Sequence, residues 1–181
     1  LKSLTHLYLY QNKIKSIPIE YLKEMYSLEC LDLGENFVDY KEVQNLYKEL
    51  EKLKDYNKLK NKIEKLDSSK DFFHFWGNTK KIPKELFNLT NLKTLSISGT
   101  NITEIPKEIS KLKNLERLSF SGNKLSSLPE EIYKMENLKY VDFDNNEFSE
   151  FPDKLLNLKN LESISFNYNK IEKIKIYLDK V

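Results

Sequence analysis

The chain has 181 residues, of which 30 are Lys or Arg and 28 are Asp or Glu, for a formal net charge of +2. This near balance gives no net field that would favour nucleic acid or an anionic membrane as a partner. Arg117 is the single arginine. Because readers of phosphates and bases rely on the guanidinium group, the composition argues against specific nucleic-acid recognition. The one cysteine, Cys30, excludes an internal disulfide and a cysteine-rich zinc module.

The start of the chain carries no targeting signal. It begins at Leu1, inside a repeat, without an initiator methionine or a signal-peptide pattern. We therefore expect a fragment of a longer chain. No apolar run approaches the roughly 18 residues that a transmembrane segment needs, so we expect no transmembrane segment. An unpaired cysteine is compatible with either side of a membrane, so the sequence assigns no localisation, cytoplasmic or secreted.

An internal repeat is marked by prolines that follow a bulky apolar residue. The last four are spaced by 23 residues and stand at Pro83, Pro106, Pro129 and Pro152. Nine residues after each proline, a leucine opens the same phrase, at Leu92, Leu115, Leu138 and Leu161. Apolar residues recur at the fourth and sixth places of this phrase, as in Leu118 and Phe120. The N-terminal part has the same phase from Leu4 and from Leu28.

The phrase has a physical interpretation. Alternation at the fourth and sixth places predicts a short strand with one buried face. The asparagine at the ninth place can bond to backbone groups of its own and the neighbouring turn, so stacked turns would form an asparagine ladder. Proline suits a segment outside the sheet because it donates no backbone hydrogen bond. The expected ladder residues are Asn12, Asn36, Asn78, Asn123, Asn146 and Asn169.

The pattern L-x-x-L-x-L-x-x-N-x-L, followed by x-x-L-P-x-x-I-x-x-L-x-x-L, resembles the leucine-rich repeat family over nearly the whole chain. It is most similar to the 23-residue type of scaffolds such as Scribble and Erbin and of many bacterial proteins. The resemblance implies an α/β fold, a right-handed horseshoe-shaped solenoid of about seven coils with a parallel concave sheet, in a single domain over 1–181. The arginine-poor, lysine- and asparagine-rich composition suggests an AT-rich genome, such as that of a spirochaete.

The period breaks after Val38, where 64 residues separate Leu28 from Leu92 although two repeats would take 46. Apolar residues in this stretch recur at steps of three and four, at Val43, Leu46, Leu50, Leu53, Leu59, Ile63 and Leu66. The spacing predicts a helical insertion over 40–68, after the second repeat. Asp55-Tyr56-Asn57 weakens the stripe, so one long helix and two shorter helices both fit.

The role of the insertion also stays open. It could cover the flank of the solenoid, where the proline turn is missing, dock a partner, or pair with a second copy as a short coiled coil. We favour the structural role because the apolar stripe is short and interrupted. Self-association through the insertion remains the alternative to a monomer.

The repeat resumes with a degenerate unit at 72–78, which fits two registers. One points Phe73 and Phe75 inward, and the other would bury Phe72 and His74. We prefer the first register because it retains the asparagine, with one residue deleted from the repeat, and avoids a costly buried imidazole.

Two further departures are visible. Thr100 stands at the asparagine place of the next repeat, where its hydroxyl supplies only part of the bonding, and this predicts local weakness. At the C-terminal end Ile174 lacks a following proline, which indicates a short cap or a cut edge.

The third, fifth and seventh places should face the concave surface, with the eighth place at its rim. Members of the family commonly bind partners there, and Tyr and Trp often anchor interfaces. We interpret the chain as a non-enzymatic protein–protein interaction module, although β-propensity alone also places such residues on exposed strands. The candidate partner-binding residues are His6, Tyr8, Tyr10, His74, Trp76, Arg117, Tyr140, Asp142, Asp144 and Tyr168.

The sequence predicts no catalytic residue, cofactor or metal site. Its two histidines lie on either side of the insertion, and Cys30 lacks an activating neighbour. Asp142 and Asp144 could suit a weakly bound cation or a lysine of a partner, but solvated carboxylates are far commoner on such a surface, so we predict no metal site there. Two alternatives to a simple binding module remain: the substrate-recognition arm of a larger enzyme or effector, and a surface or host-adhesion module of a bacterium.

Overall fold

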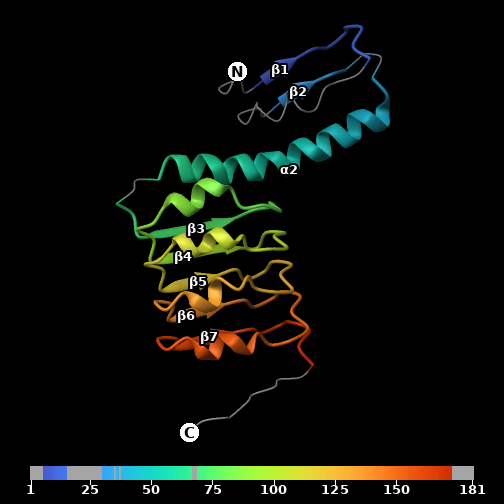
Figure 1. The fold of residues 1–181 in the computed structure, drawn as a ribbon. Coiled ribbons are helices and arrows are strands. Elements are labelled where there is room, and N and C mark those ends of the chain that lie inside the picture. The colour runs from blue at the N-terminus through green and yellow to red at the C-terminus, as the bar shows by residue number, and fades with distance from the viewer. Residues whose placement is uncertain (1–5, 16–29, 35, 37, 67–68, 173–181) are drawn as a thin grey trace. The chain divides into compact units, whose positions relative to one another are not determined.

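A computed structural model describes residues 6–15, 30–34, 36, 38–66 and 69–172 (Figure 1). The chain divides into two compact units, residues 1–61 and 62–181, and each unit is described by itself. The predicted turn at Pro18, the second repeat's start at Leu28 and the C-terminal end at Ile174 lie outside the described residues. Among the helices of the described part, none is long and apolar enough to cross a membrane.

The first unit contains two parallel strands, β1 (His6–Tyr8) and β2 (Cys30–Asp32), with Leu7 opposite Leu31. Leu31 and Leu33 are buried, as the alternation in the sequence predicts. The two strands thus occupy the same place in two successive repeats.

The insertion forms one helix, α2 (Tyr40–Glu64), of 25 residues. Asp39 caps its start, because the Asp39 Oδ1 accepts a hydrogen bond of 2.8 Å from the Lys41 backbone N–H. The helix continues through Asp55 to Asn57, so the single-helix alternative is correct. Leu59 and Ile63 are buried. The side chains of Leu46, Leu50 and Leu53 lie outside the described set.

The second unit is a five-stranded parallel sheet in the order β3-β4-β5-β6-β7. Its coils, each one repeat long, follow one another in chain order from green to red in Figure 1. The strands are β3 (Phe72–Trp76), β4 (Thr94–Ser98), β5 (Arg117–Ser119), β6 (Tyr140–Asp142) and β7 (Ser163–Ser165). An α/β repeat solenoid is therefore confirmed.

The degenerate repeat adopts the preferred register. Phe73 and Phe75 are 1% and 3% exposed, whereas Phe72 is 49% exposed. Phe73 pairs with Leu95 of the next strand, and Trp76 pairs with Ser98. This register buries two phenylalanines and leaves the imidazole of His74 exposed.

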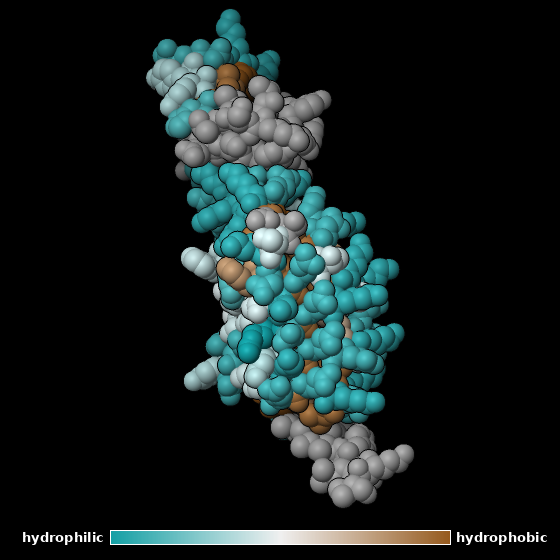
Figure 2. All heavy atoms as spheres, turned by 90° about the vertical axis from the view of Figure 1, so that its left-hand side faces the viewer, coloured by the Kyte–Doolittle hydropathy of each residue, from teal (hydrophilic) through white to brown (hydrophobic). Residues whose placement is uncertain are grey.

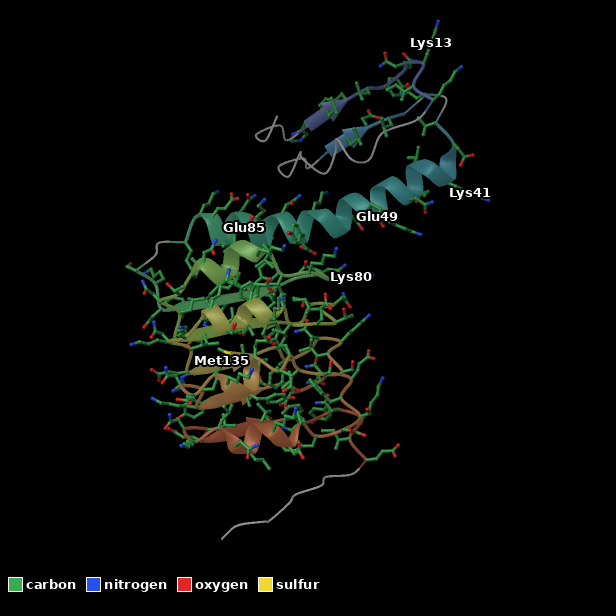
Figure 3. The ribbon with its side chains drawn as sticks, in the orientation of Figure 1. Lys13, Lys41, Glu49, Lys80, Glu85 and Met135 are labelled. Atoms are coloured by element: carbon green, nitrogen blue, oxygen red, sulfur yellow. The ribbon has the colours of Figure 1, made fainter. Side chains whose placement is uncertain are left out.

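The segments opposite the sheet contain short 3₁₀ helices, η1 (Lys84–Asn88), η2 (Lys107–Lys111), η3 (Ile132–Lys134) and η4 (Asp153–Asn157). Proline is the residue before η1, η2 and η4, where its fixed φ suits the start of a helical turn. In Figure 3, Glu85 belongs to η1 and Met135 directly follows η3.

The core lies between the sheet and these turns. Fourth-place Leu95, Leu118 and Val141 stack in one column, each at most 2% exposed. Sixth-place Phe120 and Phe143 are fully buried. Burial of each such side chain contributes roughly 1.5–3 kcal/mol. Because the buried side chains of successive strands are stacked, the exposed side chains of these strands are aligned in rows as well.

Candidate partner-binding surface

The exposed side of the unit 2 sheet, here called the sheet face, carries side chains in rows that cross the strands. The third-place row is Phe72, Thr94, Arg117, Tyr140 and Ser163. The fifth-place row is His74, Ser96, Ser119, Asp142 and Ser165. All of these residues except Phe72 line a hollow of about 300 Å³. The space-filling view in Figure 2 shows hydrophilic side chains over most of the side it draws, with hydrophobic atoms between them.

The β3 end of the sheet face is aromatic. Trp76 is 73% exposed, and the rings of Phe72 and His74 lie 5.8 Å apart. Lys62, in the last turn of α2, donates a hydrogen bond of 2.5 Å from Nζ to the His74 carbonyl. The same Nζ lies 5.8 Å from the centre of the Trp76 ring. An ammonium group therefore stands beside the exposed indole.

Hydroxyl groups fill the middle of the sheet face. The Oγ atoms of Ser96 and Ser98 are 3.1 Å apart, and those of Ser98 and Ser119 are 3.4 Å apart. Ser119 donates a hydrogen bond of 2.9 Å to Asp142 Oδ2. The hydroxyls thus form a chain that ends on a carboxylate.

Two carboxylates lie toward the β7 end. Asp144 Oδ1 accepts hydrogen bonds of 2.6 Å from the Ser165 hydroxyl and from the Asn167 backbone N–H. Partial burial acts to raise the pKa of Asp144, but the hydrogen bonds from Ser165 and Asn167 lower it below its ordinary value. Asp142 Oδ1 accepts a hydrogen bond from the Asp144 backbone N–H. Both carboxylates are thus held in fixed positions.

Arg117 and Tyr140 form a stacked pair between these regions. The guanidinium carbon of Arg117 lies 4.1 Å from the centre of the Tyr140 ring, a cation–π geometry. The Tyr140 hydroxyl donates a hydrogen bond of 2.5 Å to Glu162 Oε2. That bond, followed by the charge of Glu162, raises the pKa of Tyr140. The only arginine of the chain is therefore stacked on a ring.

The ladder asparagines share one geometry. The Asn146 amide donates to the carbonyls of Phe120 and Phe143 at 2.9 and 3.1 Å, and its Oδ1 accepts from the Leu125 N–H at 2.9 Å. The amides of Asn123 and Asn169 have equivalent partners. In unit 1, the Asn36 amide donates to the carbonyls of Leu9 in the preceding turn and Leu33 in its own. The Asn12 amide donates to the carbonyls of Leu9 and Tyr10 in its own turn.

Asn78 differs from these residues. It is exposed, and its Oδ1 accepts a hydrogen bond of 2.6 Å from Asn101, the residue after the ladder place of the next coil. The Asn101 N–H donates to the carbonyl of Thr79, whereas in the next coil the equivalent Lys124 N–H donates to the carbonyl of Ile102. Thr79 thus takes the place of Ile102, one place later than its distance from Trp76 would give. The deleted residue therefore falls between Trp76 and Thr79, and this shifts Asn78 outside the ladder.

A second asparagine row was missed by sequence reasoning. It runs along the turns that precede the strands, and the amides of Asn114, Asn137 and Asn160 each donate to a backbone carbonyl of the preceding coil at 2.8–3.0 Å. The available signal was an asparagine before each opening leucine, repeated every 23 residues.

An alternating charge row was missed as well. The second places of successive repeats are Asp71, Lys93, Glu116, Lys139 and Glu162. Lys139 Nζ lies 2.9 Å from Glu116 Oε2. Hydrogen bonding between them, followed by their charges, lowers the pKa of Glu116 and raises that of Lys139. The second-place side chains thus form a row of alternating positive and negative charges next to the sheet face.

The eighth place requires a left-handed backbone, with φ between 53° and 69° at Gln11, Gly99, Gly122, Asn145 and Tyr168. Glycine adopts this conformation without cost, and a Cβ on Gly122 would also approach Gly99 Cα to 3.2 Å. Tyr168 is a bulky residue in this region, where it is strained, and is 82% exposed.

The predicted site residues fall into two groups, one in each unit. His6, Tyr8 and Tyr10 belong to unit 1, with the His6 and Tyr8 rings 6.0 Å apart and Tyr8 65% exposed. The others belong to unit 2, where the structure brings them onto the sheet face and its rim. Among the described residues, no group of three or more His, Cys, Asp or Glu could hold a metal ion.

Comparisons with known proteins agree on the fold. The family model described as "Leucine-rich repeat region" matches residues 77–177, and the model "Leucine Rich Repeat" matches residues 3–25. No curated protein matches the chain significantly.

Three solved structures illustrate the similarity. A leucine-rich repeat protein of Leptospira interrogans aligns with a TM-score of 0.54 and 27% identity, over 97% of this chain and 49% of that one. The leucine-rich repeat domain of the type III effector XopL aligns with a TM-score of 0.58 and 21% identity, over 68% and 44%. Internalin C2 of Listeria monocytogenes aligns with a TM-score of 0.52 and 20% identity, over 95% and 75%.

The Leptospira protein suggests a bacterial origin for the chain. The chain spans about half the length of the Leptospira protein. Its fold is typical of protein–protein interaction modules.

Proposed function

Since the chain belongs to the leucine-rich repeat family, we propose that it is a non-enzymatic module that binds a partner protein through the sheet face of unit 2. The observation that carries this proposal is the set of large aromatic side chains left exposed there. Trp76, on the sheet face, is 73% exposed, and Tyr168, at its rim, is 82% exposed. The third- and fifth-place residues from His74 to Ser165 line a hollow of about 300 Å³ on the same face. Exposed Trp and Tyr bury much area at low entropic cost when a partner covers them.

Tyr168 gives independent support. A bulky residue with φ of 55° costs about 1 kcal/mol or more relative to glycine, which other coils use at this place. Strain of this kind clusters at binding sites. A tyrosine that lowers stability and points into solvent is explained if it contacts a partner.

The proposal is tested by affinity capture from cell lysates on four baits: the intact chain, Trp76→Ala, Tyr168→Gly and Leu156→Ala. Leu156 lies on η4 and is 50% exposed, so it is a matched control away from the sheet. We expect Trp76→Ala and Tyr168→Gly each to reduce capture of a specific protein about tenfold or more, as for interface hot spots, and Leu156→Ala to leave it unchanged.

Tyr168→Gly separates binding from folding. Because glycine relieves the left-handed strain, this variant should be more stable than the intact chain by about 1 kcal/mol in urea unfolding. A loss of capture by a more stable protein cannot arise from unfolding. Equal retention of every specific protein on all four baits would contradict the proposal.

A further inference from the structure

We propose that the partner segment bound on the sheet face is an extended stretch of polypeptide that carries a Lys or Arg about four residues from a bulky apolar residue. This inference rests on the proposed function and specifies the chemistry of the partner. It is carried by the seventh-place row, by the direction of the charges along it and by the size of the side chains between its ends.

The seventh-place row forms a straight path across the strands. Trp76 pairs with Ser98, and backbone hydrogen bonds of 2.8–2.9 Å join the following turns in the same alignment. In order across the sheet, the row is Trp76, Ser98, Ser121, Asp144 and Asn167. Three strand spacings of about 4.8 Å separate Trp76 from Asp144, so the distance of about 14 Å matches about four residues of extended chain.

The middle of the path suits a polypeptide backbone. Ser98 and Ser121 are small and half-buried, so a main chain can approach the sheet between the two ends. Serine hydroxyls donate and accept hydrogen bonds, and both kinds of group are present in every peptide unit. The adjoining hollow is lined by residues of all five strands, from His74 to Ser165. An occupant that crosses the strands would fill it.

The β6 end of the path favours a cation. Asp142 and Asp144 are held in place by hydrogen bonds from serine hydroxyls and backbone N–H groups. A carboxylate has about four acceptor positions, so each retains capacity for a further donor. Arg117, the one cation in the three exposed rows of the sheet face, is stacked on Tyr140. This end of the path therefore carries two preoriented carboxylates and one guanidinium, an excess of negative charge that favours a cationic side chain of the partner.

The β3 end of the path favours an apolar group and disfavours a second cation. Trp76 and Phe72 present 73% and 49% of their surface to solvent. Lys62 Nζ lies 5.8 Å from the centre of the Trp76 ring, so a cationic side chain placed on the indole would meet a like charge. The segment is thus oriented, with its apolar residue over β3 and its cation over β6.

The test is a selection of random peptides, about nine residues long to exceed the span of the sheet, displayed on phage and bound to the full chain. We expect enriched peptides to place Lys or Arg three to five residues from Trp, Phe or Leu. The consensus peptide is then synthesised with a fluorescent label and its binding measured by anisotropy. Asp144→Asn and Trp76→Ala should each weaken binding about tenfold. Lys107→Ala on η2 should bind like the intact chain.

A change in the peptide avoids any effect on folding. Replacing the cationic residue by norleucine should weaken binding to the intact chain about tenfold, and should cause a clearly smaller loss with Asp144→Asn, because both changes weaken the same charge interaction and only Asp142 remains. Failure to enrich any peptide, or a consensus without a cation, would overturn the inference. So would a consensus peptide whose affinity neither Trp76→Ala nor Asp144→Asn changes.

The two proposals fail in different ways. If a protein is captured from lysate and lost with Trp76→Ala and Tyr168→Gly, but selected peptides lack the cation and apolar pair, the proposed function stands and this inference falls. If the selection succeeds and its affinities depend on Trp76 and Asp144 as expected, the inference holds for the recognised segment. If neither a protein nor a peptide depends on the sheet face, both proposals fall.

Discussion

The coils that contain β5, β6 and β7 satisfy their buried turns differently from the coils that contain β3 and β4. In the first group, an asparagine donates both to carbonyls of its own turn and to the preceding coil. In the coil of β4, Thr100 occupies that place and its hydroxyl donates to Asn123 Oδ1. In the coil of β3, Asn78 pairs with Asn101 outside the ladder.

In the coil of β3 the difference follows from the deleted residue, which shifts Asn78 outside the ladder. In the coil of β4 it follows from the number of protons that the side chain offers. A carboxamide has two donors and one carbonyl, so it can join three backbone groups, whereas a hydroxyl has one donor. The Thr100 side chain of the β4 coil therefore offers fewer donors to the ladder than an asparagine does. The coils of β3 and β4 also border the aromatic end of the sheet face, and the regular coils carry its carboxylates.

The largest expected effect comes from breaking a regular rung. Asn146→Ala removes the donor to Phe120 and Phe143 and the acceptor for Leu125, all at buried positions. We expect the free energy of unfolding to fall by roughly 2–5 kcal/mol, because each unsatisfied group costs about 1–3 kcal/mol. Urea unfolding followed by circular dichroism measures this change. Lys124→Ala, at an exposed position, is the control and should change little, and equal effects of the two would contradict the role of the ladder.

A smaller decrease in the free energy of unfolding is expected at Thr100, where a hydroxyl replaces the ladder asparagine. Thr100→Val keeps the shape of the side chain and removes one donor to Asn123, which still accepts from the Ile102 N–H at 3.2 Å. The expected loss is about 1 kcal/mol. Native-state hydrogen exchange should also be faster in the turn at Thr100 than in the turn at Asn146. A loss as large as that of Asn146→Ala would show that the hydroxyl replaces the amide fully.

The smallest effect is expected at the exposed charge row. The pKa of Glu116 is lowered by Lys139, so its ionised form stabilises the folded state above its unfolded pKa near 4.5, and this contribution is lost as the pH falls through the folded value. Glu116→Gln should lower the urea midpoint at pH 7 by less than Thr100→Val does. The difference from the intact chain should disappear on acidification from about pH 5 to about pH 3 and in concentrated salt.

Glu104→Gln is the matched control for this comparison, because Glu104 is exposed and lies outside the charge row. It should show no such pH-dependent difference. A difference at Glu116 that persists below about pH 3 would mean that the glutamate acts through packing and not through its charge.

Much of the fold was predictable because its signals are local. The period of two in each strand and the 23-residue spacing decide which side chains face the core, and Phe73 and Phe75 follow this rule even in a degenerate repeat. The continuity of α2 was not decidable, since Asp55 to Asn57 weaken the stripe without breaking the backbone. Tertiary packing of Leu59 and Ile63 adds burial that propensity does not report.

The sheet rows followed from the same periodicity, but the partners of the side chains did not. That Arg117 stacks on Tyr140, or that Asp144 is bound by Asn167, depends on rotamers and on contacts between residues about 23 positions apart. The left-handed backbone at Tyr168 also has no signal in its own residue type, although the glycines at the same place of other repeats indicate it. The strain that supports a binding role thus became visible only with the backbone angles.

The alternating charge row implies a parity rule for the number of coils. Its unit is two repeats, because neighbouring coils carry opposite charges at the second place, from Asp71 to Glu162. Deleting the single coil that holds Glu116 would set Lys93 beside Lys139, two cations. Deleting the coils of Glu116 and Lys139 together would set Lys93 beside Glu162 and keep opposite signs. Along this row, the gain or loss of one coil therefore places two like charges side by side, whereas the gain or loss of two coils, 46 residues, preserves the alternation.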